Sequence, residues 1–162
     1  MAPPYTPDQL LARLDELGIQ VTTAEHEAVF TVEQAKAHRE GMRGVFTKNL
    51  FVRNKKGVMW LLVLQEDRKV DLKELGKQIG AGRISFGSAE RLLRTLGVVP
   101  GAVSPFGLIN DVDHQVRLVL ERALLEGETL HFHPLDNTKT TAISPAGFQK
   151  FLRSTGHEPQ LI

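Results

Sequence analysis

The sequence predicts a mixed α/β fold (α+β) in which a curled, mostly antiparallel sheet is surrounded by helices. Strand-like segments outnumber helical ones, several of them come in pairs joined by short turns, and helical segments stand between these pairs. The composition, with 41% hydrophobic and 24% charged residues among 162, is that of a globular protein. We therefore expect one domain that spans residues 1–162 and buries a core of its own.

Five helices are predicted from their end signals. The segment Thr6-Pro7-Asp8-Gln9 combines an N-cap threonine, a proline at the first helical position and a glutamine three residues after the cap. Similar N-caps open the other four helices, and glycines mark most of the helix ends. The predicted helices begin at Thr6, Thr31, Asp71, Ser88 and Ser144, and end near Gly18, Arg39, Gly80, Gly97 and Gly156.

Seven extended segments are predicted between and beyond these helices. The clearest pair is a hairpin in which Asn54-Lys55-Lys56-Gly57 joins two segments that are apolar on both faces, so that both faces are expected to be covered. Alternating apolar and polar residues predict a half-buried strand in the stretch that begins at Gln115. The predicted strands are residues 20–25, 47–53, 58–64, 83–86, 115–121, 129–134 and 140–143.

Charge and cysteine content narrow the functional classes. The formal net charge is only +1, so a nucleic-acid site would be a local patch, because the whole surface is not basic. The absence of cysteine excludes disulfides, thiolate catalysis and cysteine-rich zinc sites. No signal peptide and no apolar run of membrane-spanning length is visible, so a cytoplasmic protein without a membrane partner is expected.

The stretch LGVVPGAVSPFGLIND, from Leu96 to Asp111, is unusual for a loop. It carries three glycines and two prolines among apolar residues, and its first charge is its last residue. Surface loops are usually polar, so this one is expected to fold against the core or a ligand. Its GxxxP pattern, Gly101 to Pro105, fits either a rigid crossover between two core elements or a loop whose backbone approaches a ligand.

Three kinds of side chain are candidates for chemistry. Lys48 shares a strand face with Leu50 and Val52, and Asn49 lies on the other face; such a lysine either extends to solvent, which is the commoner case, or points at an anion. His131 and His133 point to one face of a strand, but two histidines make an incomplete metal site. We therefore expect His131 to be packed in the sheet, and His133 to lie at a strand end, where functional sites gather.

Other catalytic motifs are missing. Ser104 lies in no G-x-S-x-G elbow, and no His/Asp pair can be assigned to it from the sequence. The sequence contains no Walker loop, no Rossmann fingerprint and no HExxH motif. The small basic clusters around Lys55 and Arg91 are typical of a solvated face. From these residues alone the chain is a mixed α/β domain with an unidentified pocket.

Five motifs taken together indicate a family. In order they are FTVE from Phe30, KNLF from Lys48, SFGS from Ser85, GAVSPFGLIND from Gly101 and HPLDN from His133. This succession resembles the YbaK/ProX family of aminoacyl-tRNA deacylases, and most closely its free-standing members, which hydrolyse alanine wrongly attached to proline tRNA. The similarity runs from about Leu10 to the C-terminus. Ala89 follows Ser88 where relatives often have proline, a difference that leaves the site motifs intact.

The resemblance assigns roles to residues of this sequence. It implies that Lys48 holds the phosphate and terminal adenosine end of the tRNA, and that the backbone at Gly101 holds the hydrolytic water and a ribose hydroxyl. His133 matches a histidine near the α-amine. The resemblance further implies a substrate site that includes Val29, Phe30 and Thr31 as pocket walls, with Asn49, Ser104, Phe106 and Gly107.

The implied reaction needs no metal and no cofactor. Its implied partner is the aminoacylated 3′ end of tRNA, and an association with prolyl-tRNA synthetase is left open. Two alternatives also stay open: specificity for cysteine, serine or a non-protein amino acid, and a non-catalytic module that binds tRNA or a synthetase. The intact Lys48 and GxxxP loop favour an enzyme over the binding module.

Overall fold

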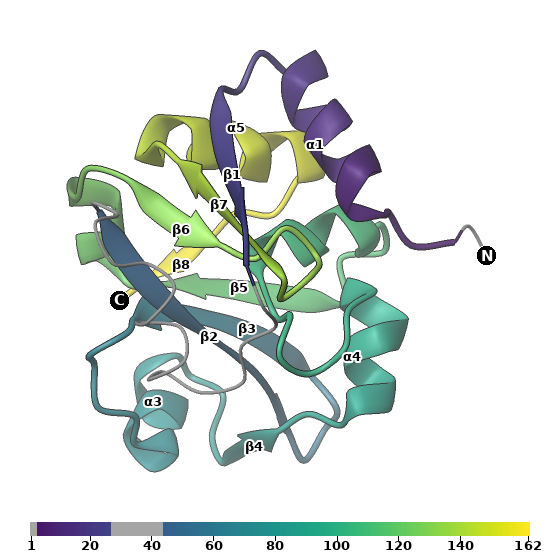
Figure 1. Cartoon of the computed structure of the whole chain (residues 1–162). Helices are drawn as coiled ribbons and strands as arrows, with labels where there is room; N and C mark the ends of the chain where they lie inside the picture. Colours follow the sequence, from purple (N-terminus) through teal and green to yellow (C-terminus); the bar gives the residue numbers. More distant parts are fainter. Residues whose placement is uncertain (1–2, 27–43) are drawn as a thin grey trace.

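The computed structural model describes residues 3–26 and 44–162, and its chain is drawn in Figure 1. The predicted helix at residues 31–39 and the predicted pocket-wall residues Val29, Phe30 and Thr31 lie outside the described residues. Over residues 3–26 and 44–162, no helix is long and apolar enough to cross a membrane.

An eight-stranded sheet forms the centre of the described structure. Its strand order is β1-β7-β6-β2-β3-β5-β8, and β4 pairs with β2 beside this path. Four of the pairings among the described strands are antiparallel and three are parallel, which confirms the predicted mixed, mostly antiparallel sheet. The strands are β1 (Val21–Glu25), β2 (Val45–Asn54), β3 (Met59–Gln65), β4 (Ile84–Phe86), β5 (Val116–Leu120), β6 (Leu130–Phe132), β7 (Lys139–Ile143) and β8 (Gln160–Leu161).

The hairpin of β2 and β3 separates two apolar clusters, as its apolar faces predicted. Phe51 of β2 packs with Leu61 and Val63 of β3 in the main core. The alternate residues, among them Val52 and Leu62, pack in a second cluster on the opposite face. Because successive side chains of a strand point to opposite faces, each residue of β2 faces one cluster or the other.

Four described helices surround the sheet: α1 (Pro7–Glu16), α3 (Leu72–Gln78), α4 (Ala89–Leu96) and α5 (Pro145–Thr155). The predicted capping box of α1 is present, with Thr6 Oγ1 accepting from the Gln9 backbone N–H and the Gln9 side chain accepting from the Thr6 N–H. Gly97 and Gly156 end α4 and α5 in the left-handed conformation. In Figure 1, α1 and α5 lie at one end of the molecule, and α3 and β4 lie at the other.

Two short 3-10 helices were not predicted, η1 (Pro105–Asn110) and η2 (Arg122–Glu126). The first lies inside the apolar stretch that the sequence analysis treats as a loop. Ser104 Oγ accepts a hydrogen bond from the Phe106 N–H at 3.1 Å, and Pro105 takes the first helical position. Such a short turn of helix presents no repeating apolar pattern, so periodicity could not have revealed it.

Candidate functional site

Gly101 lies at an exposed turn of an otherwise buried loop. Its φ is +95°, a backbone conformation that glycine adopts without strain. The turn is closed by a hydrogen bond from the Ala102 N–H to the Val99 carbonyl oxygen, at 3.1 Å. Ala102 and Ser104 are buried while Gly101 is exposed. The loop therefore exposes the backbone of Gly101 on a firmly packed base.

Ser104 is fully buried, and its hydroxyl caps η1. This placement accords with the absence of any serine-triad motif in the sequence.

Phe106 is also fully buried and packs edge-on against Phe132 and Phe151, with ring centroids 5.7 and 5.3 Å apart. Gly107 lies beside Leu96 of α4, where an added Cβ would come within 3.0 Å of the Leu96 backbone oxygen. In the described structure Ser104, Phe106 and Gly107 form the buried base of the loop. That they also contact substrate stays a prediction.

Lys48 lies on the face of β2 opposite to Phe51, with Leu64 of β3 as its strand partner. It is half-buried, and its ammonium group donates to the backbone carbonyl of Arg68. Arg68 is itself held in place, because its guanidinium pairs with Glu121 at 3.4 Å and donates to Gln78 at 3.3 Å. Since a carbonyl is neutral, this hydrogen bond orients the ammonium group without neutralising its charge.

Asn49 follows Lys48 and faces the main core. Its Nδ2 donates to Thr47 Oγ1 at 3.3 Å, whereas its Oδ1 is buried and has no hydrogen-bond partner among residues 3–26 and 44–162. A buried acceptor left unpaired costs about 1–3 kcal/mol, and in native proteins it calls for a specific explanation. A donor supplied by a substrate or by water would provide one.

His133 follows β6 at the start of the connection to β7. Its Nδ1 lies 2.8 Å from the Lys139 carbonyl oxygen, and since a carbonyl can only accept, Nδ1 is the donor. Burial lowers the pKa of His133 below its ordinary value of 6.5, His26 adds to this lowering, and the bond to Lys139 opposes it. The ring is therefore neutral at pH 7, and its Nε2 is a hydrogen-bond acceptor.

His26 is a neighbour of His133 that the sequence analysis did not single out. The two ring centroids are 6.2 Å apart, and His26 Nε2 lies 2.7 Å from Thr140 Oγ1. The backbone N–H of His26 donates to the Thr138 carbonyl, which continues the pairing of β1 with β7. This pairing joins segments more than a hundred residues apart, and no local pattern marks it.

His131 is packed in the sheet as predicted. It is 7% exposed, and its ring stacks on Phe46 with a centroid distance of 4.2 Å and an interplanar angle of 4°. Within residues 3–26 and 44–162, no group of three or more His, Cys, Asp or Glu side chains could hold a metal ion.

Asp111 anchors the chain directly after η1. Its carboxylate accepts from the backbone N–H groups of Gln115 and Val116, both at 2.9 Å, and from His157 Nε2 at 3.0 Å. Burial by itself raises the pKa of Asp111, but these hydrogen bonds outweigh it and hold the pKa below its ordinary value. The base of the loop is thus fixed to β5 and to the residue that follows Gly156 at the end of α5.

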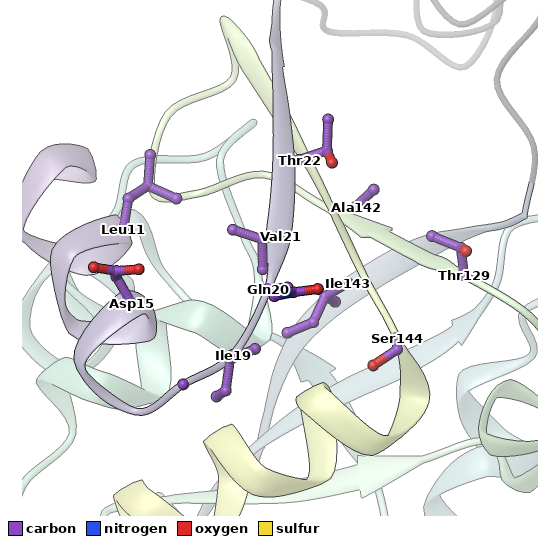
Figure 2. Close-up of a pocket in the computed structure, with 11 residues that line it drawn as sticks. Leu11, Asp15, Ile19, Gln20, Val21, Thr22, Thr129, Ala142, Ile143 and Ser144 are labelled. Carbon is purple, nitrogen blue, oxygen red and sulfur yellow. The ribbon is translucent and has the colours of Figure 1, made fainter.

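A separate hollow of about 870 Å³ lies between α1 and the β1 edge of the sheet. Figure 2 shows Leu11 and Asp15 of α1 on one side of it, and Val21, Thr22 and Ile143 of the strands on the other. None of the predicted site residues that fall within residues 3–26 and 44–162 lines this hollow. It is therefore distinct from the candidate site around the GxxxP loop.

Comparison with known proteins decides the family. The sequence model described as "aminoacyl-tRNA editing domain" matches residues 26–151. This span covers more than half of the chain and contains Lys48, the GxxxP loop and His133. The chain belongs to the aminoacyl-tRNA editing domain family.

Two curated relatives match this editing domain over almost their whole lengths. Prolyl-tRNA synthetase associated domain-containing protein 1 of Mus musculus is 38% identical over 159 residues, covering 95% of this chain and 94% of the mouse protein. The prolyl-tRNA editing protein ProX of Acetoanaerobium sticklandii is 37% identical over 149 residues, covering 91% of each chain. The similarity to the YbaK/ProX family expected from the five motifs is thereby confirmed.

A solved structure shares the fold. It is described as a candidate trans-editing enzyme for prolyl tRNA synthetase, and it superposes with a TM-score of 0.70 over 95% of this chain and 94% of its own. Its sequence is only 17% identical, so the likeness supports the fold of the editing domain and not its substrate. The predicted fold class is confirmed.

Proposed function

We propose that this editing domain acts in the cytoplasm as a deacylase that hydrolyses alanine from mischarged alanyl-tRNA(Pro). A water molecule attacks the ester carbonyl carbon, the bond to the ribose oxygen breaks, and that oxygen takes up a proton. The products are free alanine and tRNA. Because an aminoacyl ester is already activated, a correctly placed water and stabilisation of the oxyanion are sufficient catalysis.

The observation that carries this proposal is the exposed backbone of Gly101 on an otherwise buried loop. An exposed glycine backbone on a buried, multiply anchored loop can hold a water and a ribose hydroxyl without any side-chain nucleophile. Ser104, the hydroxyl nearest in sequence, is fully buried and caps η1. Preorganised backbone groups of this kind cost no reorganisation when the reaction occurs.

Two acceptors complement the loop. Asn49 Oδ1 is buried and has no partner in the part of the chain that the structure describes, so a ribose hydroxyl or the water would satisfy it. His133 Nε2 is an acceptor while the ring is neutral, and it suits the α-ammonium group of the amino acid. Lys48 contributes a positive charge oriented by the Arg68 carbonyl, which suits a phosphate of the tRNA end.

Neutral His133 predicts a particular pH dependence. Because burial holds the pKa of His133 below 6.5, its titration should leave the background-corrected deacylation rate unchanged near pH 7 and should lower the rate only at pH values below 6.5. Protonation would replace the Nε2 acceptor with a donor that repels the α-ammonium group. His133→Asn, which cannot titrate, should be slower and lack this acidic decline. An identical profile in both proteins would remove His133 from the mechanism.

The reaction should not depend on a metal ion. We expect single-turnover hydrolysis to proceed at the same rate after treatment with EDTA, because the proposed chemistry uses backbone groups, Lys48 and His133. The rate of the EDTA-treated protein is compared with its rate after zinc is added back. Activity lost with EDTA and restored by zinc would instead make His131 and His133 metal ligands.

The decisive experiment compares four substrates. Alanyl-, cysteinyl-, seryl- and prolyl-tRNA(Pro) are incubated with the protein at equal concentration, and deacylation is followed in single turnover. Rapid hydrolysis of the alanyl ester supports the proposal. A preference for the cysteinyl or seryl ester would reassign the specificity, and retention of tRNA without hydrolysis of any ester would identify a binding module.

A further inference from the structure

Asn110 joins the two ends of the loop that carries Gly101. It is the last residue of η1, and its Nδ2 donates to the carbonyl oxygen of Leu96, the last residue of α4, at 2.9 Å. The two ends of residues 97–110 therefore lie side by side, as in a compact Ω-loop. The exposed turn at Gly101 lies within this closed segment.

The two ends of the loop pack so closely that neither Gly97 nor Gly107 has space for a side chain. A Cβ added to Gly97 would lie 2.5 Å from Asn110 Nδ2, and one added to Gly107 would lie 3.0 Å from the Leu96 oxygen. Gly97 also needs its φ of +69° to end α4. The glycines thus allow a close crossing, and the Asn110 amide fixes it.

A third segment meets at the same side chain. Asn110 Oδ1 accepts from the backbone N–H of Tyr5 at 2.8 Å, and Pro4 lies beside Gly97. Tyr5 precedes α1, which is anchored in the main core through the fully buried Leu10 and Leu14. This N-terminal segment lies outside residues 26–151, which match the family's sequence model.

We propose that Asn110 is a positioning residue for deacylation, and that its amide locks the Gly101 loop to α4 and to the N-terminal segment. The proposal rests on the proposed function, in which the Gly101 backbone holds the hydrolytic water. An amide is suited to this place because it donates to the Leu96 carbonyl and accepts from Tyr5 at the same time. A carboxylate of the same shape could only accept.

Three variants test the lock. Asn110→Ala removes both hydrogen bonds, and Asn110→Asp keeps the shape but sets a carboxylate oxygen against the Leu96 carbonyl. Tyr5→Pro removes the N–H donor at an exposed residue outside α1 while leaving Asn110 in place. Ser144→Ala is the matched control, because it removes the N-cap hydrogen bond at the end of α5 opposite to His157 and should lower Tm by about 2–4 °C.

Two measurements are made on each protein: single-turnover deacylation of alanyl-tRNA(Pro) over a range of enzyme concentrations, and hydrogen exchange of the Ala102 amide. Both Asn110 variants should lower the maximal rate by about 100-fold, because small misplacements of reacting groups have effects of this size. The half-saturating concentration should change little, and Ala102 should exchange faster. Tyr5→Pro should show the same pattern more weakly, and Ser144→Ala should show neither effect.

The outcomes separate this proposal from the one on which it rests. Asn110 variants that resemble Ser144→Ala in both rate and Ala102 exchange would overturn the positioning role. If the unaltered protein hydrolyses no aminoacyl-tRNA, the proposed function fails. Exchange of the Ala102 amide still decides whether Asn110 locks the loop.

Discussion

Lys48→Ala is expected to lower the single-turnover rate of deacylation by about 100-fold or more, because loss of an orienting charge misplaces the ester relative to the water. The half-saturating enzyme concentration should rise as well, since in the proposed mechanism the ammonium group contacts the tRNA end already in the ground state. The fold should survive. Lys48 is only half-buried, and loss of the hydrogen bond from its charged ammonium group to the Arg68 carbonyl costs about 1.5–3 kcal/mol.

Two control variants separate the loss of the positive charge at Lys48 from the loss of its packing and from the loss of a positive charge elsewhere on the protein. Lys48→Met keeps most of the apolar stem that packs beside Leu50 but lacks the charge, so it should be as inactive as Lys48→Ala. Lys56→Ala removes the same charge from the exposed turn between β2 and β3 and should retain activity. Near wild-type turnover by Lys48→Met would show that the charge has no part in the reaction.

The features predicted well from the sequence are those set by neighbouring residues. Thr6 and Ser144 begin α1 and α5 because their side chains each satisfy an N–H group three residues away, and such caps can be recognised locally. The β2–β3 hairpin was predicted because its turn and both of its strands are contiguous. Its strand β2 proved longer than residues 47–53, since Val45 and Phe46 pair with β6.

Distant pairings could not be predicted in the same way. The parallel pairing of β2 with β6, the approach of His26 to His133 and the bond from Asn110 to Leu96 each bring together residues that are not neighbours in the sequence. Composition and periodicity carry no information about such partners. The motifs therefore identified the family and the loop, whereas the lock that holds the loop became visible only in three dimensions.

Hydrolysis of alanyl-tRNA(Pro) is expected to exceed that of prolyl-tRNA(Pro) by several orders of magnitude. A synthetase site built for proline rejects the smaller alanine poorly, because missing methylene groups are worth only about 1–3 kcal/mol. A second site that admits alanine and excludes proline corrects this. Forcing extra atoms into a well-packed site costs about 1–3 kcal/mol, and displacing the ester from the water that we propose Gly101 holds lowers the rate about a further 100-fold.

The measurement is single-turnover deacylation of both esters at equal enzyme concentration, with each spontaneous rate subtracted. Lys48→Ala protein serves as the control for hydrolysis that does not use the site. Seryl- and cysteinyl-tRNA(Pro) carry side chains close to alanine in size, so exclusion by size alone should reject them far less strongly than proline. Equal rates for the alanyl and prolyl esters would exclude a size-selective pocket and indicate an unspecific esterase. A prolyl ester cleaved faster than the alanyl ester would reverse the proposed role, because the protein would then destroy the correctly charged tRNA.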